Sequence, residues 1–77
     1  MTPDLLYSRT GCHLCEDAEA ALIALNWPYT RTEIDGDPDL ERLYGWHVPV
    51  LARGGQVLLK GVITRSKLLG LPPPEEF

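Results

Sequence analysis

The feature that most constrains the fold is a Cys-x-x-Cys pair, placed where an apolar run passes through a short loop into a helical repeat. Residues 5–7 form the apolar run and predict a buried strand, and residues 8–11 read as its loop. The apolar residues that follow recur at helical spacing, namely Leu14, Ala18, Ala21, Leu22 and Leu25. The chain is therefore expected to begin with a strand–helix unit that places Cys12 and Cys15 at the start of the helix.

A second strand and a second helix are predicted next. The helix ends at Asn26-Trp27-Pro28, and residues 29–34 then alternate with enough β-branched and aromatic side chains to predict a strand. Asp37-Pro38 has the pattern of an N-cap followed by proline at the first helical position. Gly45 is placed to end that short helix.

The last third of the chain predicts a hairpin and a final short helix. Residues 48–51 and 56–59 flank Gly54-Gly55, a pair typical of a tight antiparallel turn. Thr64 is expected to cap a helix that ends near Gly70. The predicted order is βαβαββα, an α/β fold with a mixed four-stranded sheet flanked by helices.

Length and composition limit the organisation and the class of function. The 77 residues are expected to form one domain, 1–77, with residues 72–77 as a frayed tail. The net charge is −4 and the basic residues are scattered, which argues against nucleic acid as a partner. The N-terminus does not resemble a signal peptide, and no apolar stretch approaches the length of a membrane span. A soluble protein of the cytoplasm is expected.

The two cysteines are the candidate catalytic residues. A bridge between Cys12 and Cys15 closes too short a loop to stabilise the fold much, so a reactive role is favoured over a structural one. Exchange of disulfides needs a thiolate, and the N–H groups and dipole of a helix start favour the anion. We expect Cys12 to have a lowered pKa and to attack, and the better shielded Cys15 to resolve the mixed disulfide.

A metal site on the same cysteines is the alternative chemistry. Zinc usually takes four ligands, often as two pairs at this spacing. The chain has no second pair and offers only His13 and His47. Redox chemistry is therefore favoured and no metal ligand is assigned.

Two residues beside the cysteines each allow a functional and a plain interpretation. A protonated His13 would stabilise the Cys12 thiolate; alternatively, it is an exposed polar side chain at the tip of the motif. Arg9 could add positive potential or hold a carboxylate of a thiol substrate; alternatively, it is a solvated loop arginine.

Pro49 falls inside the third predicted strand, where it removes a donor from the ladder. A cis bond before Pro49 would make sense of this placement. Trp46 and His47 precede it; they either line a groove or are, respectively, a packed residue and a surface residue.

The chain resembles a known family in three segments. Residues 6–16 read Leu-Tyr-Ser-Arg-Thr-Gly-Cys-His-Leu-Cys-Glu, which is similar to the opening of the small bacterial glutaredoxin-like proteins. Residues 37–40 and 44–50 resemble the second signature of the same family. The matches span most of residues 5–51 in the right order.

The resemblance implies a thioredoxin-like fold and a set of site residues. Cys12 would be the nucleophile, Cys15 the resolving thiol and Pro49 the cis-proline that faces them. The backbone of Val48 would pair with an extended thiol substrate, and Arg9 matches a residue that meets a glutathione carboxylate in glutaredoxins. The chain departs from glutaredoxins in its His-Leu between the cysteines, in His47 before Val-Pro, and in the shortened glycine motif at Lys60-Gly61.

The leading hypothesis is a thiol–disulfide oxidoreductase that reduces a small or protein disulfide. It would need no resident cofactor and would take electrons from glutathione or from a donor of the thioredoxin-reductase type. Two alternatives remain open. One is a metal or iron–sulfur carrier that uses the same cysteines, and the other is a non-catalytic module that binds a partner through Trp46 and the Pro49 loop.

Overall fold

Seven elements follow in the predicted order in the computed structural model, which describes residues 3–74. They are β1 (Asp4–Ser8), α1 (His13–Ala24), β2 (Tyr29–Glu33), α2 (Pro38–Tyr44), β3 (Val50–Arg53), β4 (Gln56–Lys60) and α3 (Arg65–Leu69). Local signals of the sequence explain the helix starts. The side chains of Asp37 and Thr64 cap α2 and α3, and Pro38 opens α2 as predicted.

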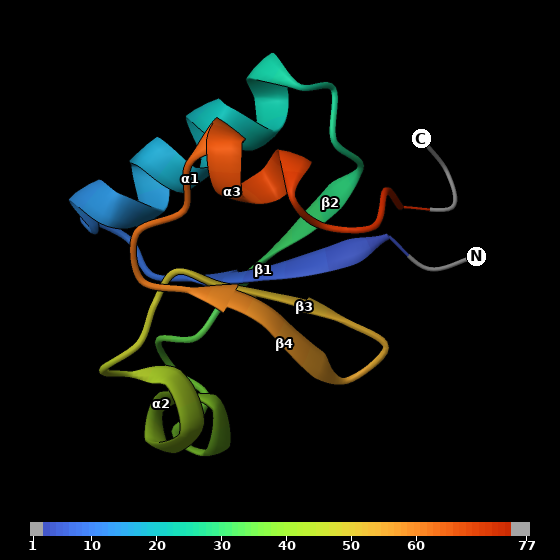
Figure 1. The fold of residues 1–77 in the computed structure, drawn as a ribbon. Helices are drawn as coiled ribbons and strands as arrows, with labels where there is room; N and C mark the ends of the chain where they lie inside the picture. Colours follow the sequence, from blue (N-terminus) through green and yellow to red (C-terminus); the bar gives the residue numbers. More distant parts are fainter. Residues whose placement is uncertain (1–2, 75–77) are drawn as a thin grey trace.

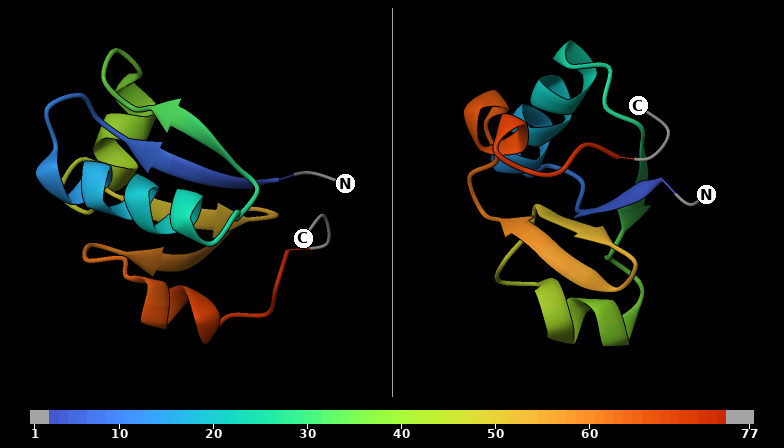
Figure 2. Two further views of the ribbon diagram at one scale, coloured as in Figure 1. Left: turned by 90° about the horizontal axis from the view of Figure 1, so that it is seen from above. Right: turned by 45° about the vertical axis from the view of Figure 1, so that its right-hand side comes forward.

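The four strands form one mixed sheet in the order β2-β1-β3-β4. β1 pairs with β2 in parallel and with β3 in antiparallel orientation, and β3 pairs with β4 as the predicted hairpin. Figure 1 shows α1 and α3 on one face of this sheet and α2 on the other, an arrangement that both views of Figure 2 support. The predicted α/β architecture is confirmed.

The third strand begins later than predicted. The sequence pattern placed it at residues 48–51, whereas the ladder with β1 begins at Val50. The peptide bond between Val48 and Pro49 is cis, as expected, and Pro49 has no N–H to donate to the ladder. The Val48 N–H instead donates to the Tyr44 carbonyl at 3.1 Å. Residues 46–49 therefore belong to the connection between α2 and β3.

The main core lies between the sheet and the two helices α1 and α3. It is formed by the buried residues Leu6, Ala18, Ala21, Leu22, Trp27, Leu51, Ile63 and Leu68. Of the predicted helix stripe, Leu25 is half-buried and packs against this core, and Leu14 lies outside it. Leu14 is 40% exposed, because the first turn of α1 directs Cys15 rather than Leu14 toward the interior.

A buried carboxylate joins the ends of several elements. Asp4 is 1% exposed and accepts hydrogen bonds from Trp27 Nε1 at 2.9 Å and from Arg53 Nε at 2.8 Å. Arg53 Nη1 also donates to the Pro72 carbonyl at 2.9 Å, and Pro74 is buried. The first half of the predicted frayed tail is thus held against the domain, while residues 75–77 lie outside the described residues. Within residues 3–74, no helix has the length and apolar character needed to cross a membrane.

Candidate redox site at the start of the first helix

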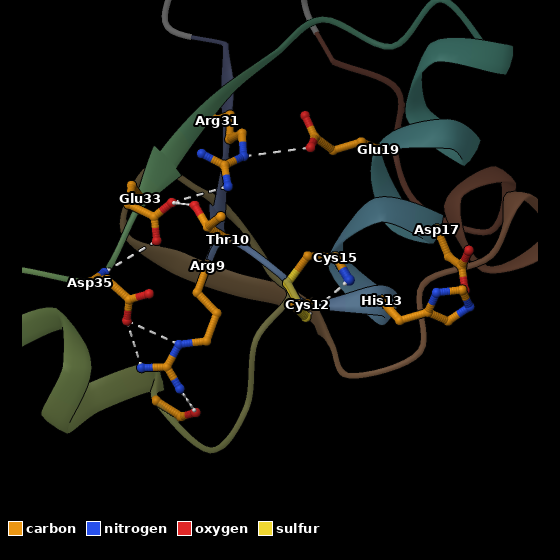
Figure 3. The surroundings of a disulfide bond; sticks show 11 residues. Arg9, Thr10, Cys12, His13, Cys15, Asp17, Glu19, Arg31, Glu33 and Asp35 are labelled. Atoms are coloured by element: carbon orange, nitrogen blue, oxygen red, sulfur yellow. Dashed lines mark hydrogen bonds and ion pairs between the residues drawn. A yellow bond between two sulfur atoms is a disulfide. The ribbon is translucent and has the colours of Figure 1, made fainter.

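The loop between β1 and α1 places the two cysteines one helical turn apart. Gly11 has φ of 78°, a left-handed conformation that glycine adopts at little cost. Cys12 then takes the extended N-cap conformation, and its Sγ accepts the backbone N–H of Cys15 at 3.2 Å. Cys12 and Cys15 form a disulfide with a Cα–Cα distance of 5.2 Å (Figure 3).

The two sulfur-bearing residues differ in exposure. Cys12 is half-buried, whereas Cys15 is 1% exposed. A substrate arriving from solvent can therefore approach Cys12 but not Cys15. This asymmetry matches the predicted division into an attacking and a resolving cysteine.

His13 lies away from the sulfurs. Its side chain is 85% exposed, and Nε2 is 3.5 Å from Asp17 Oδ2 on the next turn of α1. Figure 3 shows the imidazole directed toward Asp17 and not toward Cys12. The placement corresponds to the plainer of the two interpretations, an exposed polar residue beside the motif.

Arg9 acts as a brace, a role that neither sequence interpretation included. Its guanidinium donates from Nη2 to Asp35 Oδ1 at 2.8 Å and from Nη1 to the Gly45 carbonyl at 3.2 Å. These bonds connect the cysteine loop to the end of α2 and to the turn before it (Figure 3). The partners are 26 and 36 residues away in the chain, so no local sequence signal identifies them.

A second contact ties the cysteine loop to the end of β2. Thr10 Oγ1 donates to Glu33 Oε1 at 2.9 Å. This hydrogen bond is the main reason that the pKa of Glu33 lies below its usual value; partial desolvation opposes it, and the Asp35 N–H and Arg31 add to the lowering. Glu33 therefore stays ionised beside the loop as the pH falls toward the ordinary carboxyl range.

The connection that contains His47, Val48 and Pro49 lies at the same end of the sheet as the cysteines. Val50 pairs with Tyr7 across β1 and β3, which places Pro49 beside the end of the strand that leads to Cys12. Pro49 is fully buried and its carbonyl accepts the Gly61 N–H at 2.9 Å. His47 is exposed. The Val48 N–H bonds the Tyr44 carbonyl, and the pairing of the Val48 backbone with a substrate stays a prediction.

At this end the structure decides between the two interpretations of Trp46 and adds Ser8, which the sequence did not indicate. Trp46 is 95% exposed and lines a shallow pocket with Arg9, Glu41 and Gly45, so the packing interpretation of Trp46 is wrong. Ser8, the last residue of β1, is fully buried, and its hydroxyl has no hydrogen-bond partner among residues 3–74. The local sequence indicates neither how exposed a side chain such as Trp46 is nor whether a hydroxyl such as that of Ser8 finds a hydrogen-bond partner.

The potential metal ligands do not gather. No group of three or more His, Cys, Asp or Glu side chains converges anywhere in the part of the chain that the structure describes. A metal bound by Cys12 and Cys15 would therefore need further ligands other than the His, Cys, Asp and Glu side chains of residues 3–74.

A dithiol pair at a helix start, beside a cis-proline connection on a sheet of order β2-β1-β3-β4, defines a protein with a thioredoxin-like fold of the glutaredoxin type. The chain belongs to the family described as the glutaredoxin-like domain (DUF836), whose model matches residues 5–69. The resemblance seen in the sequence is thereby confirmed. No curated protein matches the chain.

Solved structures agree with this assignment. The X-ray structure of protein XcR50 from X. campestris is 36% identical, covers 90% of this chain and 99% of its own, and superposes with a TM-score of 0.75. The solution structure of protein Ne2328 from Nitrosomonas europaea is 33% identical over 91% of each chain, with a TM-score of 0.71. The holo form of glutaredoxin C1 from Populus tremula × tremuloides is 21% identical over 90% of this chain and 72% of its own, with a TM-score of 0.61, and so supports the fold alone.

Proposed function

We propose that the protein is a thiol–disulfide oxidoreductase that exchanges two electrons through Cys12 and Cys15. The observation that carries the proposal is the difference between the two sulfurs. Cys12 lies at the N-cap, accessible and bonded to a helix N–H, while Cys15 is buried one turn behind it at disulfide distance. The N-cap N–H groups that stabilise a carboxylate or phosphate also stabilise a thiolate.

The reaction proceeds in two exchanges. The Cys12 thiolate attacks one sulfur of the substrate disulfide, forming a mixed disulfide and releasing the first substrate thiolate, which takes a proton from water. The Cys15 thiol loses its proton and attacks Cys12 Sγ, which forms the Cys12–Cys15 disulfide and releases the second substrate thiol. The substrate disulfide is reduced by two electrons, and the protein dithiol is oxidised by two.

Return to the dithiol requires an external donor and no resident cofactor. Two equivalents of glutathione, or one dithiol of a thioredoxin-reductase-type system, balance the reaction. We propose a cytoplasmic setting, where such donors are available. Arg9, His13, His47, Val48 and Pro49 stay candidate substrate-binding residues.

The test is a redox titration of the purified protein in glutathione buffers, followed by the mass shift after thiol alkylation. Wild type should show a reversible two-electron transition. Cys12→Ser should lose disulfide-reductase activity, while Cys15→Ser should accumulate a mixed disulfide at Cys12. Full activity in Cys12→Ser would contradict the proposal. Tightly bound metal in anaerobically purified protein, with no disulfide formed under oxidising buffer, would favour the carrier alternative.

A further inference from the structure

Trp46 is exposed to a degree that folding does not explain. The chain has two tryptophans, and Trp27 is 4% exposed while Trp46 is 95% exposed. Tryptophan is a large apolar residue and one of those enriched where proteins bind partners. An indole left in water beside a reactive site therefore indicates a surface that a partner covers.

Trp46 adjoins the cysteine loop through a short chain of contacts. It lines a pocket with Arg9, whose guanidinium bonds the carbonyl of Gly45, the residue before Trp46. Arg9 is three residues before Cys12. The connection that carries Trp46 also runs at the end of the sheet where α1 begins (Figures 1 and 2). A polypeptide whose sulfur reaches Cys12 would thus extend over Trp46.

The surroundings of Trp46 are acidic. Residues 33–41 contain no basic residue and five acidic ones, namely Glu33, Asp35, Asp37, Asp39 and Glu41. Three of them are paired with arginine, namely Asp35 with Arg9, Glu33 with Arg31, and Asp39 with Arg42, which leaves Asp37 and Glu41. The Asp37 side chain caps α2, and Glu41, which lines the Trp46 pocket, accepts the Gly36 N–H at 3.0 Å. Both bonds are to neutral N–H groups, so they leave the negative charges of these two carboxylates uncompensated. This acidic shoulder, residues 33–41, complements a positively charged partner.

A glutathione carboxylate finds a poorer match here. Arg9, the cation expected to hold it, has its guanidinium bonded to Asp35 and to the Gly45 carbonyl. Binding a carboxylate would compete with that ion pair and would bring negative charge toward the acidic shoulder.

We infer that the substrate is a disulfide in a basic, extended polypeptide segment, whose apolar side chain covers Trp46 while a lysine or arginine faces the acidic shoulder. This inference rests on the dithiol activity proposed above and names its substrate class. Opposite charge guides the segment to the site, and the indole supplies apolar contact.

The first experiment compares two peptides with the same disulfide and the same apolar residues, flanked by lysines in one and by glutamates in the other. At low salt, kcat/KM should be about tenfold higher for the basic peptide, and the difference should shrink as salt screens the charges. Trp46→Ala should lower kcat/KM for the basic peptide about tenfold more than for hydroxyethyl disulfide. Glu41→Gln should reduce the preference for lysine, whereas Glu19→Gln, which removes the same charge from α1, should not.

A binding measurement separates this inference from the proposed function. The Cys12→Ser/Cys15→Ser protein should bind a serine-substituted basic peptide with a change in tryptophan fluorescence that Trp46→Phe abolishes, because buried Trp27 is shielded. Binding without turnover in wild type would overturn the oxidoreductase function and leave the docking surface. Turnover of hydroxyethyl disulfide without preference between the peptides would overturn the inference alone. A higher kcat/KM for glutathione disulfide than for the basic peptide would also overturn it. So would a dimer of the wild-type protein that Trp46→Ala abolishes, because a second copy of the chain would then cover Trp46.

Discussion

Cys12 and Cys15 have identical side chains only three positions apart, but their surroundings differ in exposure and in hydrogen bonding. The Cys12 sulfur occupies an N-cap position and accepts a helix N–H, while Cys15 faces the core. Their neighbours also have assigned partners: His13 lies beside Asp17, and Arg9 bonds Asp35. Ser8 is the exception, since its buried hydroxyl is without a partner within residues 3–74.

Ser8→Ala should stabilise the protein. Removing a buried hydroxyl that makes no hydrogen bond relieves its desolvation cost, so the free energy of unfolding in urea should rise by about 1 kcal/mol. The matched control is Thr64→Ala, which deletes a hydroxyl that accepts the Lys67 N–H at 3.2 Å and should cost about 1 kcal/mol. A loss of stability in Ser8→Ala would show that the hydroxyl does have a partner.

Tyr29 should make stability depend on pH in the alkaline range. Burial, together with the hydrogen bond to Glu19, raises the pKa of Tyr29 to about 12. Because the folded value lies above the unfolded value of about 10, this stability is complete below pH 10 and is lost as the pH rises through 12. Urea unfolding from pH 9 to 12 should therefore show a steeper loss in wild type than in Tyr29→Phe. Parallel curves would contradict the raised pKa.

At the scale of elements, α2 is held mainly by its ends. None of its residues is buried, and the ring of Tyr44 stacks on Tyr7 at 4.6 Å. The Asp37 side chain caps its start, and Arg9 bonds the Gly45 carbonyl at its end. The position of Trp46, which follows directly, therefore depends on a few polar contacts and one ring stack.

Asp37→Ala should loosen α2 before it affects the rest of the fold. The loss of an N-cap acceptor should cost about 1 kcal/mol and should speed hydrogen exchange at the amides of α2 more than at those of α1. Asp39→Ala is the control, because its ion pair with Arg42 is exposed and should contribute little. Equal exchange in the two variants would mean that the cap does not hold α2.

At the scale of the whole molecule, a polar network complements the apolar core. Asp4 joins the start of β1 to Trp27 after α1 and to Arg53 at the end of β3, and Arg53 continues to Pro72. Segments from the beginning, middle and end of the chain thus meet at the end of the sheet opposite the cysteines. A small domain with a limited core gains from such long-range links.

Asp4→Ala should reduce global stability more than a surface substitution does. It removes the buried carboxylate that accepts from Trp27 Nε1 and from Arg53 Nε, so the free energy of unfolding should fall by about 3 kcal/mol. Asp4→Asn keeps an acceptor and should cost less. A change under about 0.5 kcal/mol in Asp4→Ala, the range of surface positions, would show that the network does not stabilise the fold.

Much of the fold follows from local signals, and for that reason it could be predicted. The spacing of apolar residues, the caps Asp37 and Thr64, and the Gly54-Gly55 turn act over a few positions, and all appear in the structure. The start of β3 differs from the prediction, because the Val48 N–H bonds the Tyr44 carbonyl and Pro49 has no N–H to donate, so the ladder with β1 begins only at Val50.

The element order, the family, and the placement of Cys12 and Cys15 at a helix start could all be read from the sequence, because each depends on residues close together in the chain. The three-dimensional arrangement was needed to learn that Arg9 bonds Asp35 and Gly45, that Asp4 bonds Arg53, and that Trp46 faces solvent. The partners in these bonds lie 26, 36 and 49 residues apart. Such contacts, and the exposure of a loop side chain, depend on how distant segments pack and not on the local pattern.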